Sequence, residues 1–309
     1  MMQGMVPLYG FGGGSGGTGA TLTVTAPAGC TVTVSKDGKS KTKVAGADGV
    51  AVFKGLETGE WTITITDGEQ TAQKTATVTA DYTAEITFFA ATINVTYPAG
   101  SACTATDGMT TLTAPDTSGT WECVVPNAGT WTVSLDRGYQ ETVDVTASGS
   151  TYTLKNWHLY HAGVDCTAVT GGWAGKGMKS RSSSTLTAAA PTITKGSADI
   201  TATNAGEEKS GALYAKNKIN LSGFTKLTVN GSFKNASATD GNTSIFLWSA
   251  IGTYAQDNVI SQSRIAKNTT ETTVLVELSG SNGLCNFGFW MSSSASNYVK
   301  ITECYLTAG

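Results

Sequence analysis

Hydrophobic and polar residues alternate in short runs along most of the chain, a pattern typical of half-buried β-strands. Leu22 and Val24, for example, are separated and flanked by threonines. Turn residues divide the runs, and Asp37-Gly38 is a dipeptide that readily takes the positive φ angles of a type I′ hairpin turn. This alternation, broken by turns, predicts an all-β protein.

The same pattern of strands and turns occurs twice. TLTVTAPAG at 21–29 recurs as TINVTYPAG at 92–100, and GEWTITI recurs as GTWTVSL. Each copy is about 70 residues long, which suits a small sandwich of seven short strands and is too long for a solenoid repeat. We therefore predict two tandem immunoglobulin-like or prealbumin-like β-sandwich modules, module one at residues 21–89 and module two at 90–154.

Trp61 and Trp131 occupy equivalent positions in the two copies. Each begins a strand of alternating hydrophobic residues, so each is predicted to anchor the core of its module. The last strand of module one, near 86–89, leads almost directly into the first strand of module two, near 93–95. So short a connection predicts that the modules stack as a semi-rigid rod.

Residues 155–309 have no counterpart upstream. Eight strand candidates in this stretch predict a jelly-roll β-sandwich. Within it, the phrase LYAKNKINLSGFTKLTVNGSF at 213–233 passes through a turn into an alternating strand, as is common in carbohydrate-binding sandwiches.

The first 20 residues are predicted to form a glycine-rich N-terminal arm. GGGSGGTG cannot build a core and leaves the backbone free, which fits a disordered linker. Alternatively, the arm is an anchoring tail that orders on a neighbouring subunit. The residues that would dock there are Val6, Leu8, Tyr9 and Phe11.

Composition narrows the classes of protein that the chain can belong to. Charged residues make up 14%, against about 25% in typical soluble domains, whereas there are 51 threonines and 37 glycines. Such a composition is typical of extracellular or virion β-proteins. The net charge of −3 and a total of three arginines argue against a nucleic-acid partner.

The sequence has no run of 18 apolar residues, so no membrane insertion is predicted. The N-terminus lacks the basic region and unbroken apolar stretch of a signal peptide. We therefore expect a chain that folds in a cytoplasm and yet has the composition of a surface protein. A virion protein assembled in the host cytoplasm meets both conditions.

The repeats, with their TYPAG and AGTWTV phrases, resemble PEGA-like and immunoglobulin-like modules of phage and prophage tail-associated proteins. The start PLYGFGGG is similar to the N-termini of the same group, and residues 155–309 resemble a galactose-binding-like or carbohydrate-module-like jelly roll. The resemblance implies a virion surface role in adhesion. Fibres of this kind are symmetric oligomers, often trimers.

Motifs for catalysis or cofactor binding are not recognisable in the sequence, which has no GxSxG, HExxH, P-loop or EF-hand pattern. We predict no catalytic residues and no cofactor, although paired carboxylates cannot be recognised from sequence spacing. His158 and His161 lie three positions apart, and on a regular strand they would face opposite sides. They are therefore predicted to be ordinary histidines, and no metal site is predicted.

The chain has six cysteines. Cytoplasmic folding disfavours disulfides, so they are predicted to be small buried hydrophobic residues. If any pair is bridged, Cys103–Cys123 or Cys285–Cys304 is the best candidate, since the members of each pair lie within one predicted domain.

A sugar site needs aromatic rings for the apolar face of the sugar and polar side chains for its hydroxyl groups. Trp173 in GGWAGKG and Tyr254 in IGTYAQDN lie in glycine-rich or polar segments, where rings are often exposed. By contrast, the rings of FGFW at 287–290 are predicted to be core. The predicted ligand patch comprises Trp173, Trp248, Tyr254, Gln256, Asp257 and Asn258.

These observations favour a non-enzymatic phage virion protein that projects from the particle and binds host-surface protein or glycan through its C-terminal domain. Its partners would be other virion proteins, through the arm, and the host cell surface. A capsid decoration or head fibre with a purely structural role is the main alternative. A bacterial surface adhesin fits less well without a signal peptide, and a carbohydrate-binding part of an enzyme lacks an attached catalytic domain.

Overall fold

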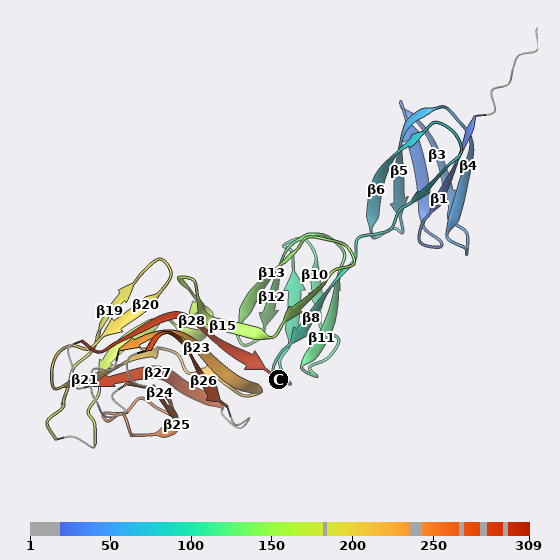
Figure 1. The fold of residues 1–309 in the computed structure, drawn as a ribbon. Coiled ribbons are helices and arrows are strands. Elements are labelled where there is room, and N and C mark those ends of the chain that lie inside the picture. Colours follow the sequence, from blue (N-terminus) through green and yellow to red (C-terminus); the bar gives the residue numbers. More distant parts are fainter. Residues whose placement is uncertain (1–18, 182–183, 235–242, 266–268, 279–282, 293–295) are drawn as a thin grey trace, which may run out of the picture. The chain divides into compact units, whose positions relative to one another are not determined.

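The structure is a computed structural model, and it falls into two compact units, residues 1–89 and 90–309 (Figure 1). The residues that it describes are 19–181, 184–234, 243–265, 269–278, 283–292 and 296–309.

The described part of the chain is almost entirely β-structure, which confirms the predicted all-β class. Its single α-helix, α1 (Thr167–Thr170), is one turn long. In the described ranges, no helix has the length and apolar character needed to cross a bilayer. The predicted anchoring residues lie outside the described part of the chain: Val6, Leu8, Tyr9 and Phe11.

Module one is a seven-stranded β-sandwich. Its three-stranded sheet has the order β4-β1-β7, and its four-stranded sheet has the order β3-β2-β5-β6. The strands are β1 (Ala20–Thr25), β2 (Thr31–Lys36), β3 (Lys39–Val44), β4 (Val50–Leu56), β5 (Gly59–Thr66), β6 (Thr71–Val78) and β7 (Tyr82–Glu85).

The core of module one forms where the inward faces of both sheets meet. Trp61 and Ile63 on β5 are buried in it, together with Phe53 from the opposite sheet. The Trp61 Nε1–H donates to the carbonyl of Glu57 at 2.9 Å, so the polar atom of this large ring is satisfied. The prediction that Trp61 anchors this core is confirmed.

The hairpin between β2 and β3 forms one edge of this sandwich. Asp37 and Gly38 have φ angles of 48° and 76°, as the predicted type I′ turn requires. Every residue of β3 is exposed. Lys41 and Lys43 donate from Nζ to carbonyls of β4 at 2.8 and 2.6 Å. Charged side chains therefore cover an edge that could otherwise pair with another sheet.

Module two repeats this topology. Its sheets have the orders β11-β8-β14 and β10-β9-β12-β13, and in both modules the first and last strands pair in parallel. Trp131 on β12 is fully buried, and its Nε1–H donates to the Asn127 carbonyl at 3.2 Å, as Trp61 does in module one. The strands are β8 (Ala91–Thr96), β9 (Cys103–Thr106), β10 (Thr111–Thr113), β11 (Thr120–Val125), β12 (Gly129–Leu135), β13 (Gln140–Val145) and β14 (Thr151–Leu154).

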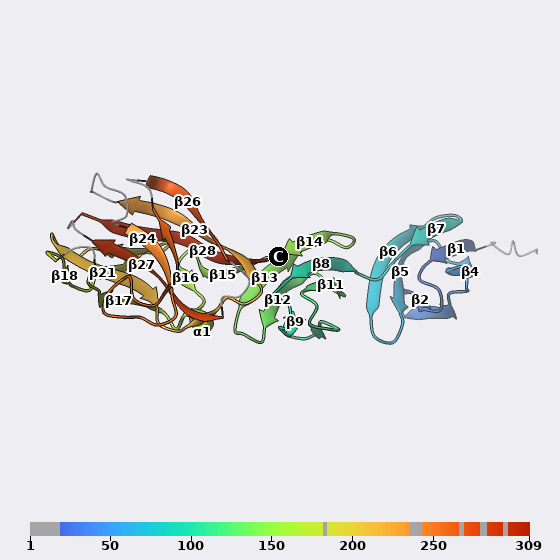
Figure 2. The ribbon, with the colours of Figure 1, turned by 90° about the horizontal axis from the view of Figure 1, so that it is seen from below.

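Residues 155–309 form a larger sandwich of two sheets, of the predicted jelly-roll type (Figure 2). In the first sheet, β28 pairs with β23 along one edge and with β15 and β20 along the other. The strands of this sheet are β15 (Asn156–His161), β16 (Val164–Asp165), β19 (Thr192–Lys195), β20 (Ile200–Thr203), β23 (Phe224–Lys234), β26 (Thr269–Glu277) and β28 (Tyr298–Ala308).

The second sheet of this sandwich is built around β27. Phe289 on β27 stacks on Phe233 of β23 at 6.4 Å between ring centroids, so aromatic rings fill the space between the two sheets. The rings of Phe287 and Trp290 are also buried, which confirms that FGFW belongs to the core. The strands are β17 (Trp173–Gly177), β18 (Thr187–Ala188), β21 (Lys209–Ala215), β22 (Ile219–Asn220), β24 (Thr243–Trp248), β25 (Val259–Arg264) and β27 (Leu284–Ser292).

Module two and the C-terminal sandwich pack against each other within the unit of residues 90–309. Trp157 on β15 is fully buried, and its Nε1–H donates to the Thr96 carbonyl of module two at 3.0 Å. Tyr139 of module two meets the ring of Phe224 edge to face, with 5.3 Å between centroids. Arg137 of module two donates to a carbonyl of the sandwich at 2.7 Å. Apolar packing and hydrogen bonds therefore hold this junction together.

Candidate functional site

A β-bulge in β15 brings two histidines together at the junction. His158 pairs with Tyr305 and His161 pairs with Glu303, two positions apart on β28, although the histidines are three apart on β15. The register shifts just after His158, so Leu159 is the extra residue of the bulge.

The bulge places both imidazole rings on the same face of the sheet. Residues two apart on a strand share a face, so the partners on β28 define that face for both histidines. The rings of His158 and His161 lie 4.7 Å apart between centroids. The prediction that they point to opposite sides is therefore wrong, because it assumed a regular strand and the bulge adds one residue between them.

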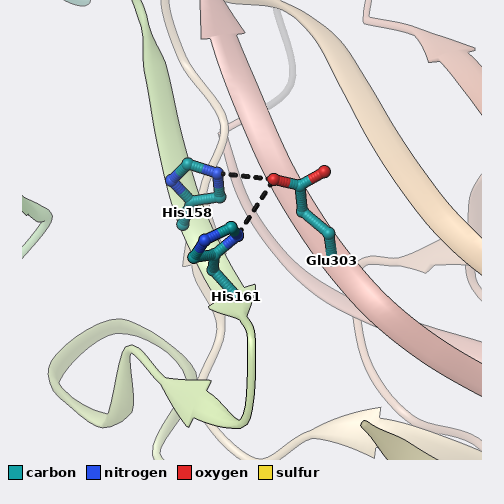
Figure 3. A group of neighbouring side chains, drawn as sticks. All are labelled: His158, His161 and Glu303. Atoms are coloured by element: carbon teal, nitrogen blue, oxygen red, sulfur yellow. Dashed lines mark hydrogen bonds and ion pairs between the residues drawn. The ribbon is translucent and has the colours of Figure 1, made fainter. Parts of the chain in front are cut away.

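Glu303 completes a three-residue cluster with the two histidines (Figure 3). Its Oε1 lies 3.0 Å from His158 Nε2 and 3.0 Å from His161 Nδ1. One ligand-type atom from each of the three residues lies within 4.8 Å of the others. Two ring nitrogens thus converge on one carboxylate oxygen.

Two further side chains orient the members of this cluster. Glu141, on β13 of module two, holds His158 Nδ1 between its carboxylate oxygens at 3.0 and 2.9 Å. Asn230 on β23 donates from Nδ2 to Glu303 Oε2 at 2.5 Å. Because these contacts use the outer atoms of the ring and of the carboxylate, His158 Nε2 and Glu303 Oε1 face each other.

The same contacts shift the pKa values of His158 and Glu303. Burial alone would lower the pKa of His158, but its bonds to Glu141 and Glu303 outweigh burial and raise that pKa above its usual range. Burial alone would raise the pKa of Glu303, but donation from Asn230 and His158 outweighs it and lowers that pKa. The charged forms of both groups are thus favoured where the surface is only partly accessible to water.

A groove of about 680 Å³ opens beside the cluster. It runs between module two and the start of the C-terminal sandwich, and His158, His161 and Glu141 form part of its wall. His161 is the most open member of the cluster, with 58% of its side chain exposed. A small ion or solute can therefore reach the cluster from this groove.

Two residues of the predicted ligand patch lie in the core instead. Trp248 is fully buried, stacks on Phe246 at 5.0 Å and donates from Nε1 to the Ala255 carbonyl at 2.8 Å. Trp173 is 8% exposed and packs edge-on against Phe287 at 5.7 Å. The predictions that these rings form an exposed platform are wrong. Trp173 points between the two sheets toward Phe287, whereas Trp248 lies on the other face of its sheet, where it is buried in a cluster with Met178, Ala255 and Trp290.

The other four residues of that patch lie together between β24 and β25. Tyr254 and Asp257 are partly exposed, and Gln256 and Asn258 are exposed. Sequence reasoning missed their partner, Arg181, whose guanidinium lies 4.8 Å over the Tyr254 ring and bonds Asp257 Oδ1 from Nε at 2.9 Å. Arg181 lies in a serine-rich stretch far from residues 254–258 in the sequence, so no sequence pattern predicts this contact.

All six cysteines are free thiols, and five of them are buried. Burial raises the pKa of the Cys103, Cys123 and Cys285 thiols to about 12. The prediction of small buried hydrophobic residues is confirmed for these positions, and neither candidate pair is bridged.

Comparison with known proteins leaves the family open. No family model matches the sequence, and the search of curated proteins finds no match. A solved structure of carbohydrate-binding modules from the β-sandwich superfamily is 11% identical, with 81% of this chain and 90% of that chain covered and a TM-score of 0.28.

Two further solved structures show similarly low similarity. The Bacillus anthracis TIE protein is 8% identical, with 90% of this chain and 49% of that chain covered and a TM-score of 0.21. A DUF3823 family protein from Bacteroides ovatus is 9% identical, with 71% of this chain and 98% of that chain covered and a TM-score of 0.16. The chain thus spans about half the length of the TIE protein. Scores this low carry no function from these proteins to this chain.

Proposed function

We propose that the protein is a non-enzymatic binding protein whose C-terminal sandwich binds a glycan through the surface around Tyr254. The observation that carries the proposal is the pairing of Tyr254 with Arg181. Asp257 holds the guanidinium over the ring, while 63% of the arginine side chain stays exposed. An aromatic ring with fixed polar neighbours matches the mixed apolar and hydroxyl surface of a sugar.

The loops that carry this surface are fastened to each other through their backbones. Lys179 donates from its amide to the Thr253 carbonyl at 2.9 Å, and the Ala255 amide donates to the Lys179 carbonyl at 2.9 Å. Gln256 Oε1 accepts from the Arg181 amide at 3.0 Å. Such preorganisation supports binding, because less conformational entropy is lost when the ligand docks.

The sequence supports a virion setting for this binding protein. In this proposal the glycine-rich arm joins other virion proteins, the repeated modules project the C-terminal sandwich, and the particle carries the chain as a symmetric homotrimer. The sandwich then contacts glycan or protein on the host surface. Close packing between module two and the sandwich supports the projecting role, since it gives the binding domain a firm base.

Substitutions in the Tyr254 surface test the binding proposal. Tyr254→Ala and Arg181→Ala are each expected to weaken binding to host cells or to a glycan array at least about tenfold, because each removes one of the two paired groups. Tyr82→Ala, at an exposed tyrosine of module one, is the matched control and should bind normally. Near-UV circular dichroism checks the fold. Wild-type affinity in both folded variants would contradict the proposal.

A purely structural role in a capsid decoration or head fibre is the second candidate. It is favoured by the way Asp257 and Gln256 already use their polar atoms to fasten the loops. Labelling intact virions with an antibody against residues 155–309 separates the two. Labelling at the tail tip and inhibition of adsorption are expected for the binding role. Labelling over the capsid without inhibition would support the structural role.

A further inference from the structure

We propose that His158, His161 and Glu303 bind a divalent transition-metal ion of the zinc type at the junction between module two and the C-terminal sandwich. The proposal is separate from glycan binding, because the cluster and the Tyr254 surface share no residue. It rests on the donor set, on the side chains that orient the donors, and on access from the groove.

The donor set matches the chemistry of zinc. Two imidazole nitrogens and one carboxylate oxygen are common protein ligands of Zn²⁺, at about 2.0–2.2 Å from the ion. Ligands at that distance lie about 3–3.5 Å from one another in a tetrahedral site. Both nitrogen–oxygen separations to Glu303 Oε1 are 3.0 Å. His161, the most exposed ligand, has room to adjust its ring to the ion.

Glu141 supplies the independent observation that points to a metal. Histidine ligands usually donate their second ring N–H to a carboxylate, which fixes the tautomer and turns the other nitrogen toward the ion. Glu141 accepts from His158 Nδ1 in this way, so Nε2 is the atom turned toward Glu303, and it would bind an ion on losing the proton that it donates to Glu303 Oε1. Asn230 orients Glu303 in a similar way, because it occupies Oε2 and so turns Oε1 toward the two histidines.

An ion bound at this position would stabilise the junction between module two and the C-terminal sandwich. His158 and His161 lie on β15, the first strand after module two, and Glu303 lies on β28. Glu141 belongs to module two and is 14% exposed. An ion held by the three ligands therefore ties β15 to β28 and, through His158, strengthens the contact with module two. Three protein ligands leave a further coordination position for water on the side of the groove.

Metal titration of the full-length chain tests the proposal, with Co²⁺ as a spectroscopic probe and Zn²⁺ in calorimetry. One ion per chain is expected, with the visible absorption of tetrahedral or five-coordinate Co²⁺. Saturating Zn²⁺ should raise the Tm of the unit of residues 90–309 by several degrees. The chain has two histidines in all, and both belong to the cluster. Metal binding that depends on histidine therefore places the ion at this cluster.

Variants then separate ligands from orienting residues. His161→Ala is expected to lower the affinity at least about 100-fold, and Glu141→Gln about 10–100-fold. Glu122→Gln, at an exposed glutamate of module two, should bind like the native chain. The exposed position of His161 allows its variant to fold, which near-UV circular dichroism verifies. Native binding weaker than about 0.1 mM, or equally tight binding by folded His161→Ala, would overturn the proposal.

Discussion

Replacing Trp157 with alanine is expected to destabilise the unit of residues 90–309 by about 3–5 kcal/mol, the usual cost of emptying a site filled by a buried aromatic ring. The ring is fully buried, and its Nε1–H reaches the Thr96 carbonyl of module two. The substitution therefore removes both core volume and a hydrogen bond at the junction. Module two and the sandwich should then unfold in two separate calorimetric transitions.

The partly buried Trp121, on β11 of module two, provides the matched control. Trp121→Ala removes an equally large side chain, but its position is less buried, so the expected loss is smaller and a single transition should remain. Denaturant unfolding measures the loss of stability, and calorimetry measures the number of transitions. A loss below about 1 kcal/mol in Trp157→Ala would show that the junction does not depend on this ring.

The second large effect is expected at Trp61. Trp61→Ala should cost module one about 3–5 kcal/mol, a large share of the roughly 5–15 kcal/mol by which a typical domain is stable. Because residues 1–89 form a compact unit, the loss should stay within that unit. Hydrogen exchange of the full chain is expected to show faster exchange in β1–β7 and unchanged protection after residue 90.

Trp131→Ala is the reciprocal experiment. Trp131 fills the equivalent place in module two, so exchange should accelerate in β8–β14 while β1–β7 stay protected. The two variants together test whether the repeated modules have independent cores. Equal loss of protection in both units after either substitution would contradict that independence.

The local features of the modules could be predicted because their signals lie close together in the chain. Alternation with a period of two decides which side chains face the core, and Trp61 and Trp131 follow it. Asp37-Gly38 forms the expected turn because its positive φ angles depend on those residues themselves. Because the sequence pattern is duplicated, the strands and core tryptophan predicted for one module could also be predicted for the other.

The candidate sites were less predictable because their contacts are distant in sequence. His161 and Glu303 are 142 positions apart, and no local residue pattern marks the bulge that turns His158 toward them. Arg181 meets Asp257 across 76 positions. Trp248 ends a strand beside a polar loop, and only the tertiary packing of Ala255 and Met178 against its ring decides that the ring is buried.

The sequence by itself determined the β-class, the repeated modules and their tryptophan-centred cores, since propensity, alternation and turn chemistry act over a few residues. Only the tertiary structure decided that His158, His161 and Glu303 converge and that Glu141 of module two orients them. The physical reason is that one inserted residue in β15 reverses the face of every side chain after it. Strand register, set by the packing of whole sheets, therefore controls the chemistry at this junction.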